Sequence, residues 1–200
     1  MRCLLRPLVL IGVFFSTCLI PAAAQNSKPT TPSGDLVTEI EEWKRFSPSA
    51  MGFSVLLPSR PTVTDQTIEN PNGNIINHVY YSEFRSDVFM VTVAKFPEPI
   101  SDKNRIKLML DNGRDNGLSG SKAELKSEKE ITLDGNYGRE WEMVLPKSIR
   151  ARSRAYWVTD TLYQLIALVP EVQTPQIAKE SDERVFKFLE SFELKRKVSE

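Results

Sequence analysis

One segment limits what this chain can fold into more than any other, the apolar run 161–169, TLYQLIALV. Alternate side chains of a β-strand point to opposite faces of its sheet. One face of this strand carries Leu162, Ile166 and Leu168, and the other carries Tyr163, Leu165 and Val169. A strand that is apolar on both faces has to be covered on both faces. The segment therefore predicts a central strand with a layer packed on each side of its sheet.

Two helices are predicted to supply those layers. The first begins at Ser101 as N-cap, with Asp102 in the first turn, and ends at Gly117. Its apolar positions are Ile106, Met109 and Leu110. The second begins at Pro175, with Thr174 as its cap. Its buried stripe is predicted to be Ala178, Val185, Leu189 and Phe192.

The remaining elements are mostly strands. They are predicted at 53–57, 61–66, 75–84, 88–96, 124–133, 137–145 and 149–158, after a short helix or irregular lead-in at 37–44. Pro61 makes 61–66 an edge strand, and a turn at 70–74 joins it to the next strand. Strands, a helix, four strands and a helix predict an α+β domain, an antiparallel β-sheet with helices packed on both faces.

Several short motifs resemble those of PsbP-like domains. The strand that starts at Tyr163 runs into Pro170, and after a helix the chain leaves through Ser191-Phe192. The opening Phe53-Ser-Val-Leu-Leu-Pro58 with Pro61 resembles that of secreted bacterial relatives, among them the DcrB-like group, and Leu133 to Tyr137 ahead of Glu142 fits more loosely. The resemblance covers most of residues 43–194. It implies an α-β-α sandwich in a family of mostly non-catalytic accessory proteins.

The N-terminus is typical of a secretory signal peptide. Arg2 and Arg6 precede an apolar stretch at 8–20, and Pro21 precedes three alanines ahead of Gln25. We expect cleavage before Gln25 and a periplasmic or extracellular protein. The alternative, an uncleaved anchor, has an apolar stretch that is short for a bilayer, which needs about 20 residues. The predicted organisation is a signal peptide at 1–24, a linker at 25–35, one domain at 36–196 and a tail at 197–200.

Cysteine content and charge narrow the chemistry further. Cys3 and Cys18 both lie in the signal segment, so the mature chain has no thiol for catalysis, a disulfide or metal binding. Lipidation of Cys18 is a minority alternative, because Phe15-Ser-Thr17 before it is a poor lipoprotein signal. The formal net charge of +0 gives no general case for nucleic acid. We expect no cofactor, and no membrane span after cleavage.

Three candidate sites have plainer interpretations. His78 is the only histidine, so it cannot form a metal cluster with other histidines, and no G-x-S-x-G motif accompanies it. The segment 117–122 lacks the residue order of a phosphate loop and follows a helix. The segment 111–115 has the composition of a calcium loop but the wrong spacing.

The most informative polar pattern is Arg150, Arg152 and Arg154 on one predicted strand. Period-two spacing puts the three guanidinium groups on one face, where, with Tyr156 alongside, they would form a ledge for an anion. The alternative is structural. A hairpin turn at 146–148 sets Glu142 beside Arg152 and Glu140 beside Arg154 as cross-strand ion pairs. We favour the structural interpretation of the row.

Together these features predict a non-enzymatic accessory or binding domain, whose partner is a protein or a small anionic ligand. The alternative is an envelope-associated hydrolase that uses carboxylate or arginine side chains. A pair of buried carboxylates that converge in a pocket would favour the hydrolase.

Overall fold

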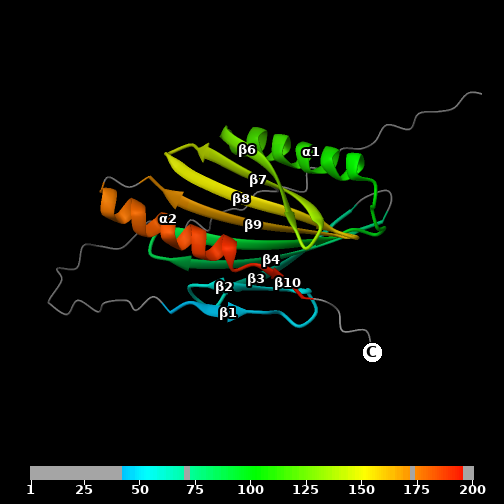
Figure 1. The fold of residues 1–200 in the computed structure, drawn as a ribbon, viewed down its shortest axis with the longest axis horizontal. Helices are drawn as coiled ribbons and strands as arrows, with labels where there is room; N and C mark the ends of the chain where they lie inside the picture. The colour runs from blue at the N-terminus through cyan, green and yellow to red at the C-terminus, as the bar shows by residue number, and fades with distance from the viewer. Residues whose placement is uncertain (1–41, 70–72, 172–173, 196–200) are drawn as a thin grey trace, which may run out of the picture.

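The computed structural model describes residues 42–69, 73–171 and 174–195 (Figure 1). The strands are β1 Lys44–Phe46, β2 Phe53–Leu57, β3 Thr62–Ile68, β4 Ile75–Phe84, β5 Asp87–Lys95, β6 Glu124–Leu133, β7 Asn136–Leu145, β8 Ile149–Val158, β9 Thr161–Pro170 and β10 Glu193–Leu194. The helices are α1 Lys103–Ser121 and α2 Pro175–Glu190. The predicted signal peptide, linker and tail, most of the lead-in, and the centre of the 70–74 turn lie outside the described residues.

Seven strands form one antiparallel sheet in the order β3-β4-β5-β9-β8-β7-β6. Strand β9, the apolar segment of the sequence, occupies its middle. Strand β3 lies at one end of this sheet, which confirms the edge position predicted from Pro61. A second sheet in the order β1-β2-β10 joins the two ends of the domain.

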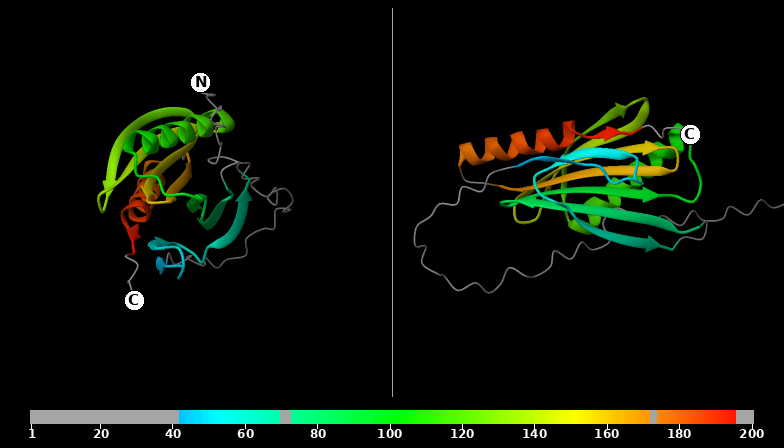
Figure 2. Two further views of the ribbon diagram at one scale, coloured as in Figure 1. Left: turned by 90° about the vertical axis from the view of Figure 1, so that its right-hand side faces the viewer. Right: turned by 90° about the horizontal axis from the view of Figure 1, so that it is seen from below.

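The two faces of the main sheet are covered by different elements. On one face, α1 packs Ile106 and Leu110 against Trp141 and Trp157. On the other, α2 and the small sheet cover a core that contains Leu165 of β9. The chain passes from α2 almost directly into β10, so the helix and the small sheet lie side by side (Figures 1 and 2). The predicted α+β class, an antiparallel sheet with a helix on each face, is confirmed.

The ends of α1 differ from those predicted. The N-cap is Asp102, whose carboxylate accepts a hydrogen bond from the backbone N–H of Arg105 at 2.7 Å, and not Ser101. The helix continues through Gly117, which is buried, and stops at Lys122 in the left-handed conformation. A glycine that packs a helix closely onto its neighbours has the same sequence signature as a glycine that ends one. The segments 111–115 and 117–122 therefore belong to α1 and its C-cap.

Helix α2 agrees with its predicted start and is held by a buried polar contact as well as by its apolar stripe. Val185 and Leu189 are buried as expected, while Ala178 is only half-buried. The Nε–H of Arg184 donates to Asp87 of β5 at 2.7 Å, and the exposed fractions of these side chains are 6% and 4%. No helix among the described residues is long and apolar enough to cross a bilayer.

Candidate functional site

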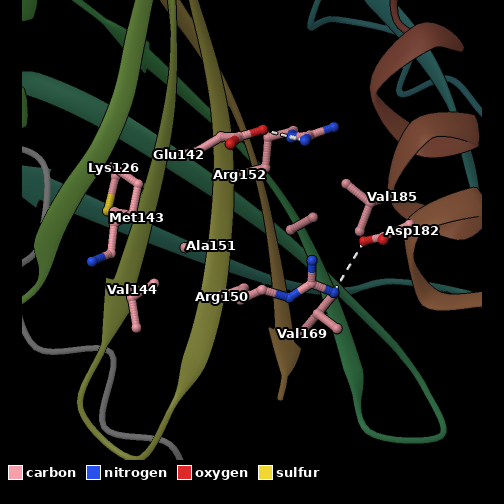
Figure 3. Close-up of a pocket in the computed structure, with 11 residues that line it drawn as sticks. Lys126, Glu142, Met143, Val144, Arg150, Ala151, Arg152, Val169, Asp182 and Val185 are labelled. Atoms are coloured by element: carbon pink, nitrogen blue, oxygen red, sulfur yellow. Dashed lines mark hydrogen bonds and ion pairs between the residues drawn. The ribbon is translucent and has the colours of Figure 1, made fainter. Parts of the chain in front are cut away.

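The arginine row lies on β8, on the face of the main sheet that α2 covers (Figure 3). Strand register places Arg152 opposite Glu142 and Arg154 opposite Glu140, as the sequence predicted. Both ion pairs form. Arg150, which has no carboxylate opposite it, reaches across to Asp182 of α2 at 3.0 Å. Every arginine of the row therefore already has an acidic partner.

The innermost pair of the row is also the most buried. The Arg154 and Glu140 side chains are 17% and 8% exposed, and Lys129 contacts the same carboxylate at 2.8 Å. Burial opposes ionisation of Glu140, but hydrogen bonds from Lys129 and Arg154 outweigh it and lower the pKa of this carboxyl group below its ordinary value. Burial likewise opposes the charge of Arg154, and its bonds to Glu190 and Glu140 outweigh that and raise its pKa.

Tyr156 has its ring in the core, while its hydroxyl group interacts with Arg154 of the row. Its ring stacks on Phe192 with centroids 5.9 Å apart and planes 3° from parallel, and it is 5% exposed. Burial raises the pKa of its hydroxyl group. Tyr156 is thus adjacent to the row but buried, and its part in an anion site stays a prediction.

A shallow pocket lies beside Arg150 and Arg152. Figure 3 shows this pocket between the strand that carries the arginines and α2. Its volume is about 100 Å³, and the residues that line it include Arg150, Arg152, Ala167, Val169 and Val185. That is room for about three water molecules, well below the roughly 300–1,000 Å³ of typical ligand pockets. The geometry supports the structural interpretation, and anion binding by the row stays a prediction.

A much larger cleft, of about 840 Å³, opens on the same face at the other end of the sheet. Five separate segments line it: the β1–β2 loop, the β4–β5 strands, the β6–β7 turn, the β8–β9 turn with the start of β9, and the end of β10. The lining residues with apolar side chains are Ala50, Met51, Val93, Val158, Tyr163 and Leu194. Those with polar side chains are His78, Lys95, Asp134, Asn136, Thr159, Asp160, Thr161 and Lys195.

The floor of the cleft is fixed by one tyrosine and one glycine. The Tyr163 hydroxyl donates to the carbonyl oxygen of Met51 at 2.9 Å. Gly52, with φ +67°, lies so close that an added Cβ would stand 3.1 Å from the Tyr163 hydroxyl oxygen. The β1–β2 loop can rest on this ring because residue 52 has no side chain. A glycine also adopts a positive φ without steric cost.

The β8–β9 turn at the rim holds an unusual backbone conformation. Thr159 has φ 56°, which is uncommon for a residue branched at Cβ. Its carbonyl oxygen accepts hydrogen bonds from the Ile100 N–H and from the Trp157 indole, both at 2.9 Å. The backbone carbonyl oxygen of Asp160, the next residue, accepts a hydrogen bond from the Phe96 N–H at 2.8 Å. The segment that leads into α1 therefore holds the strained turn in place, and strain of this kind concentrates at functional sites.

Charges on the rim of the cleft are mixed in sign. Lys95 lies 3.7 Å from Asp160, which is partly buried. The Nδ1–H of His78 donates to Asp65 at 2.6 Å. Asp134 and Lys195 line the cleft as exposed residues. This rim offers donors and acceptors of both charges, so the cleft has no dominant sign.

Neither a metal centre nor an acid pair stands out in the part of the chain that the structure describes. No group of three His, Cys, Asp or Glu side chains there is arranged to hold a metal ion. The buried carboxylates of Asp87 and Glu140 lie outside the cleft, and each is bonded to an arginine. The two carboxylates of the cleft, Asp134 and Asp160, are both accessible to solvent.

No protein-family model and no curated protein matches the chain. The structure is similar to the solution structure of cyanobacterial PsbP (CyanoP) from Synechocystis sp. PCC 6803. The identity is 15%, the TM-score is 0.48, and the match covers 84% of this chain and 99% of that one. Neither the family models nor the curated proteins support the DcrB-like part of the resemblance.

The sequence did not reveal the cleft, because its lining comes from segments far apart in the chain. Two local signals were present. Asp134-Gly135 and Thr159-Asp160 are both hairpin turns. In an antiparallel sheet these two turns lie at the same end of the strands. No sequence motif assigns His78 a functional role, and the structure places it at the edge of the cleft with Asp65 as its partner.

Proposed function

We propose that the mature chain is an exported, non-enzymatic binding module and that its ligand occupies the cleft above Tyr163. The observation that carries this proposal is the cleft itself. Its volume of about 840 Å³ falls in the range of small-molecule sites. An apolar floor with polar groups around it is also the usual composition of such sites. The proposed export rests on the N-terminal segment, with its positive start, apolar run and alanine-rich cleavage site.

Binding is favoured over hydrolysis by the placement of the carboxylates. A general acid needs a raised pKa, which follows from burial without a cationic partner. The pKa of Glu140 is lowered, because hydrogen bonds from Lys129 and Arg154 outweigh the effect of burial. The carboxylates on the cleft rim are accessible to water. The site is therefore better built to hold a molecule than to transform one.

Native mass spectrometry of the mature protein, purified gently from its own host, tests this proposal. Wild type should carry an additional mass that is absent from Ala50→Trp, because an indole at this exposed lining position would obstruct part of the cleft. Ser49→Trp is the matched control, since residue 49 is also exposed but does not line the cleft. An additional mass that Ala50→Trp retains, or none in wild type, would contradict the proposal.

A further inference from the structure

The two end strands of the main sheet are protected from pairing to very different degrees. An end strand presents unpaired backbone N–H and C=O groups, and natural proteins usually block such edges with charges or bulges. Strand β6 follows this rule, with a bulge between Leu125 and Ser127 and the charged residues Glu124, Lys126, Glu128, Lys129 and Glu130. Strand β3, at the opposite end, is exposed along almost its whole length and carries one charge, on Asp65.

Apolar side chains flank that one charge on the face of the sheet that α2 covers elsewhere. Val63 and Ile76 are 52% and 46% exposed, and they are among the few large hydrophobic residues at the surface of the described chain. Register places Val63, Asp65 and Thr67 of β3 opposite Tyr80, His78 and Ile76 of β4. The Asp65–His78 pair therefore lies between two exposed apolar side chains.

This surface is continuous with the cleft. His78 lines the cleft and donates to Asp65, so the edge of the sheet begins where the cleft ends. Val93 of the cleft floor stands directly opposite His78 on the next strand. A molecule that fills the cleft and extends past His78 reaches β3, whose outer edge pairs with no strand in the described part of the chain.

We propose that the ligand is an extended peptide segment, which adds to β3 as a further strand and inserts one end into the cleft. This inference rests on the proposed function and names its ligand class. Backbone hydrogen bonds to an open edge supply affinity, and alternate side chains supply specificity. On the α2 face, successive alternate residues of the added strand stand opposite Val63, Asp65 and Thr67.

Those three positions define the sequence of the peptide. Val63 selects an apolar residue, and Asp65 selects a lysine or arginine as an opposite charge across the strands. Thr67 is small, so a long apolar side chain opposite it extends towards Ile76. The motif is apolar-x-basic-x-apolar. It is the same in both directions, and so it holds for parallel and antiparallel addition.

A second copy of this chain fits the edge less well. Antiparallel pairing of two β3 strands centred on residue 65 would place the two Asp65 carboxylates directly opposite each other. Like charges in that position destabilise a strand pair. A peptide with a cation at this position has no such cost.

Fluorescence anisotropy with two labelled peptides, STLTKTLTS and STLTETLTS, tests the inference on the mature protein. We expect wild type to bind the lysine peptide at least tenfold more tightly, and Asp65→Lys to prefer the glutamate peptide. Thr64→Lys is the control, because it adds a charge to the same strand on the opposite face, and it should keep the wild-type preference. Absence of binding, or a preference that Asp65→Lys leaves unchanged, would overturn the inference. A dimer that sedimentation detects and Asp65→Lys dissociates would overturn it as well.

The variant Ala50→Trp separates this inference from the proposed function. If the co-purified molecule disappears in Ala50→Trp but persists in Asp65→Lys, and the peptides do not bind, the cleft holds a small molecule and the peptide inference fails. If no molecule co-purifies but the lysine peptide binds through Asp65 and is insensitive to Ala50→Trp, binding at the edge stands and the cleft is not its site. Loss of lysine-peptide binding in both variants, with the glutamate peptide still bound by Asp65→Lys, is the expected result.

Discussion

Thr159 has a strained backbone conformation that contacts with neighbouring residues stabilise. Its φ of 56° is disfavoured for a side chain branched at Cβ, and such a conformation costs on the order of 1–2 kcal/mol. The two hydrogen bonds accepted by its carbonyl oxygen hold it there. The strained turn therefore lowers the stability of the fold, and its hydrogen bonds fix the position of the cleft rim.

Replacing Thr159 with glycine should raise the free energy of unfolding by about 1 kcal/mol, because glycine adopts this φ without strain. Urea denaturation of the purified domain measures the change. Gly135→Ala is the opposite control. Gly135 has φ +79° and open space around it, so alanine there should destabilise through the backbone alone. A loss of stability in Thr159→Gly would show that the turn is unstrained.

The arginine row contains pairs of unequal burial, and substitutions should separate them. Arg152 and Glu142 are 40% and 38% exposed, so Arg152→Ala should cost about 1 kcal/mol or less, and the swap Glu142→Arg with Arg152→Glu should recover most of it. Arg154→Met should lower the free energy of unfolding more, by about 2–3 kcal/mol, because the buried Glu140 carboxylate loses a cationic partner. Lys129 still contacts that carboxylate and limits the loss. Chemical denaturation checks both values, and equal costs would refute the distinction.

Glu140 should also contribute to acid sensitivity. Burial opposes its ionisation, but its hydrogen bonds from Lys129 and Arg154 outweigh this and lower its pKa in the folded state below the ordinary 4.5. A lowered folded pKa stabilises the fold above the unfolded value, and this stabilisation is lost as the pH falls through the folded pKa. The free energy of unfolding should therefore decrease below about pH 4.5, and decrease less steeply in Glu140→Gln. Denaturation series between pH 3 and pH 6 provide the comparison, and parallel curves would count against this role.

At the scale of elements, α2 is fixed to the sheet by the buried contact between Arg184 and Asp87, which Ser181 completes at 3.2 Å from the carboxylate. Arg184→Met should destabilise by about 3–5 kcal/mol, because it leaves a buried carboxylate without its cation. Adding Asp87→Leu should restore most of the loss, since two apolar groups can replace a buried ion pair at little cost. Thermal and urea unfolding of the single and double variants decide this. A double variant no better than the single one would mean that α2 needs the ion pair itself.

The elements were predictable where one local pattern decided the outcome. The apolar run of β9 required cover on both faces, and Pro175 after Thr174 marked the start of α2. The end of α1 was predicted wrongly, because Gly117 packs within the helix and does not terminate it. Strand β10 has only two residues, too few for a period-two pattern to show.

The candidate sites divide in the same way. The pairing of Arg152 with Glu142 followed from the length of one hairpin, which is local information. The cleft depends on Gly52 meeting Tyr163 and on Thr159 being held by Ile100, and these contacts join residues far apart in the chain. Long-range contacts of this kind leave no periodic signal in the sequence.

At the scale of the whole molecule, the N-terminal segment gives a prediction about processing. Intact-mass analysis of exported protein should find a chain that begins at Gln25 and weighs less than the 22.7 kDa precursor, because the three alanines before it suit a signal peptidase. Retained Met1 on exported protein, or a lipid on Cys18, would overturn this. Replacing Ala24 with a bulky residue such as Trp should slow the cleavage.

The pairing of β10 with β2 has a consequence for when the domain can form. Strand β5 pairs with β9, and β2 pairs with Glu193 and Leu194 of β10, near the far end of the chain. A ribosome releases the N-terminal strands long before these partners exist, whereas β6 to β9 can pair in succession as they emerge. The seven-stranded sheet can therefore assemble before the small sheet, whose third strand exists only once residues 193 and 194 have been made.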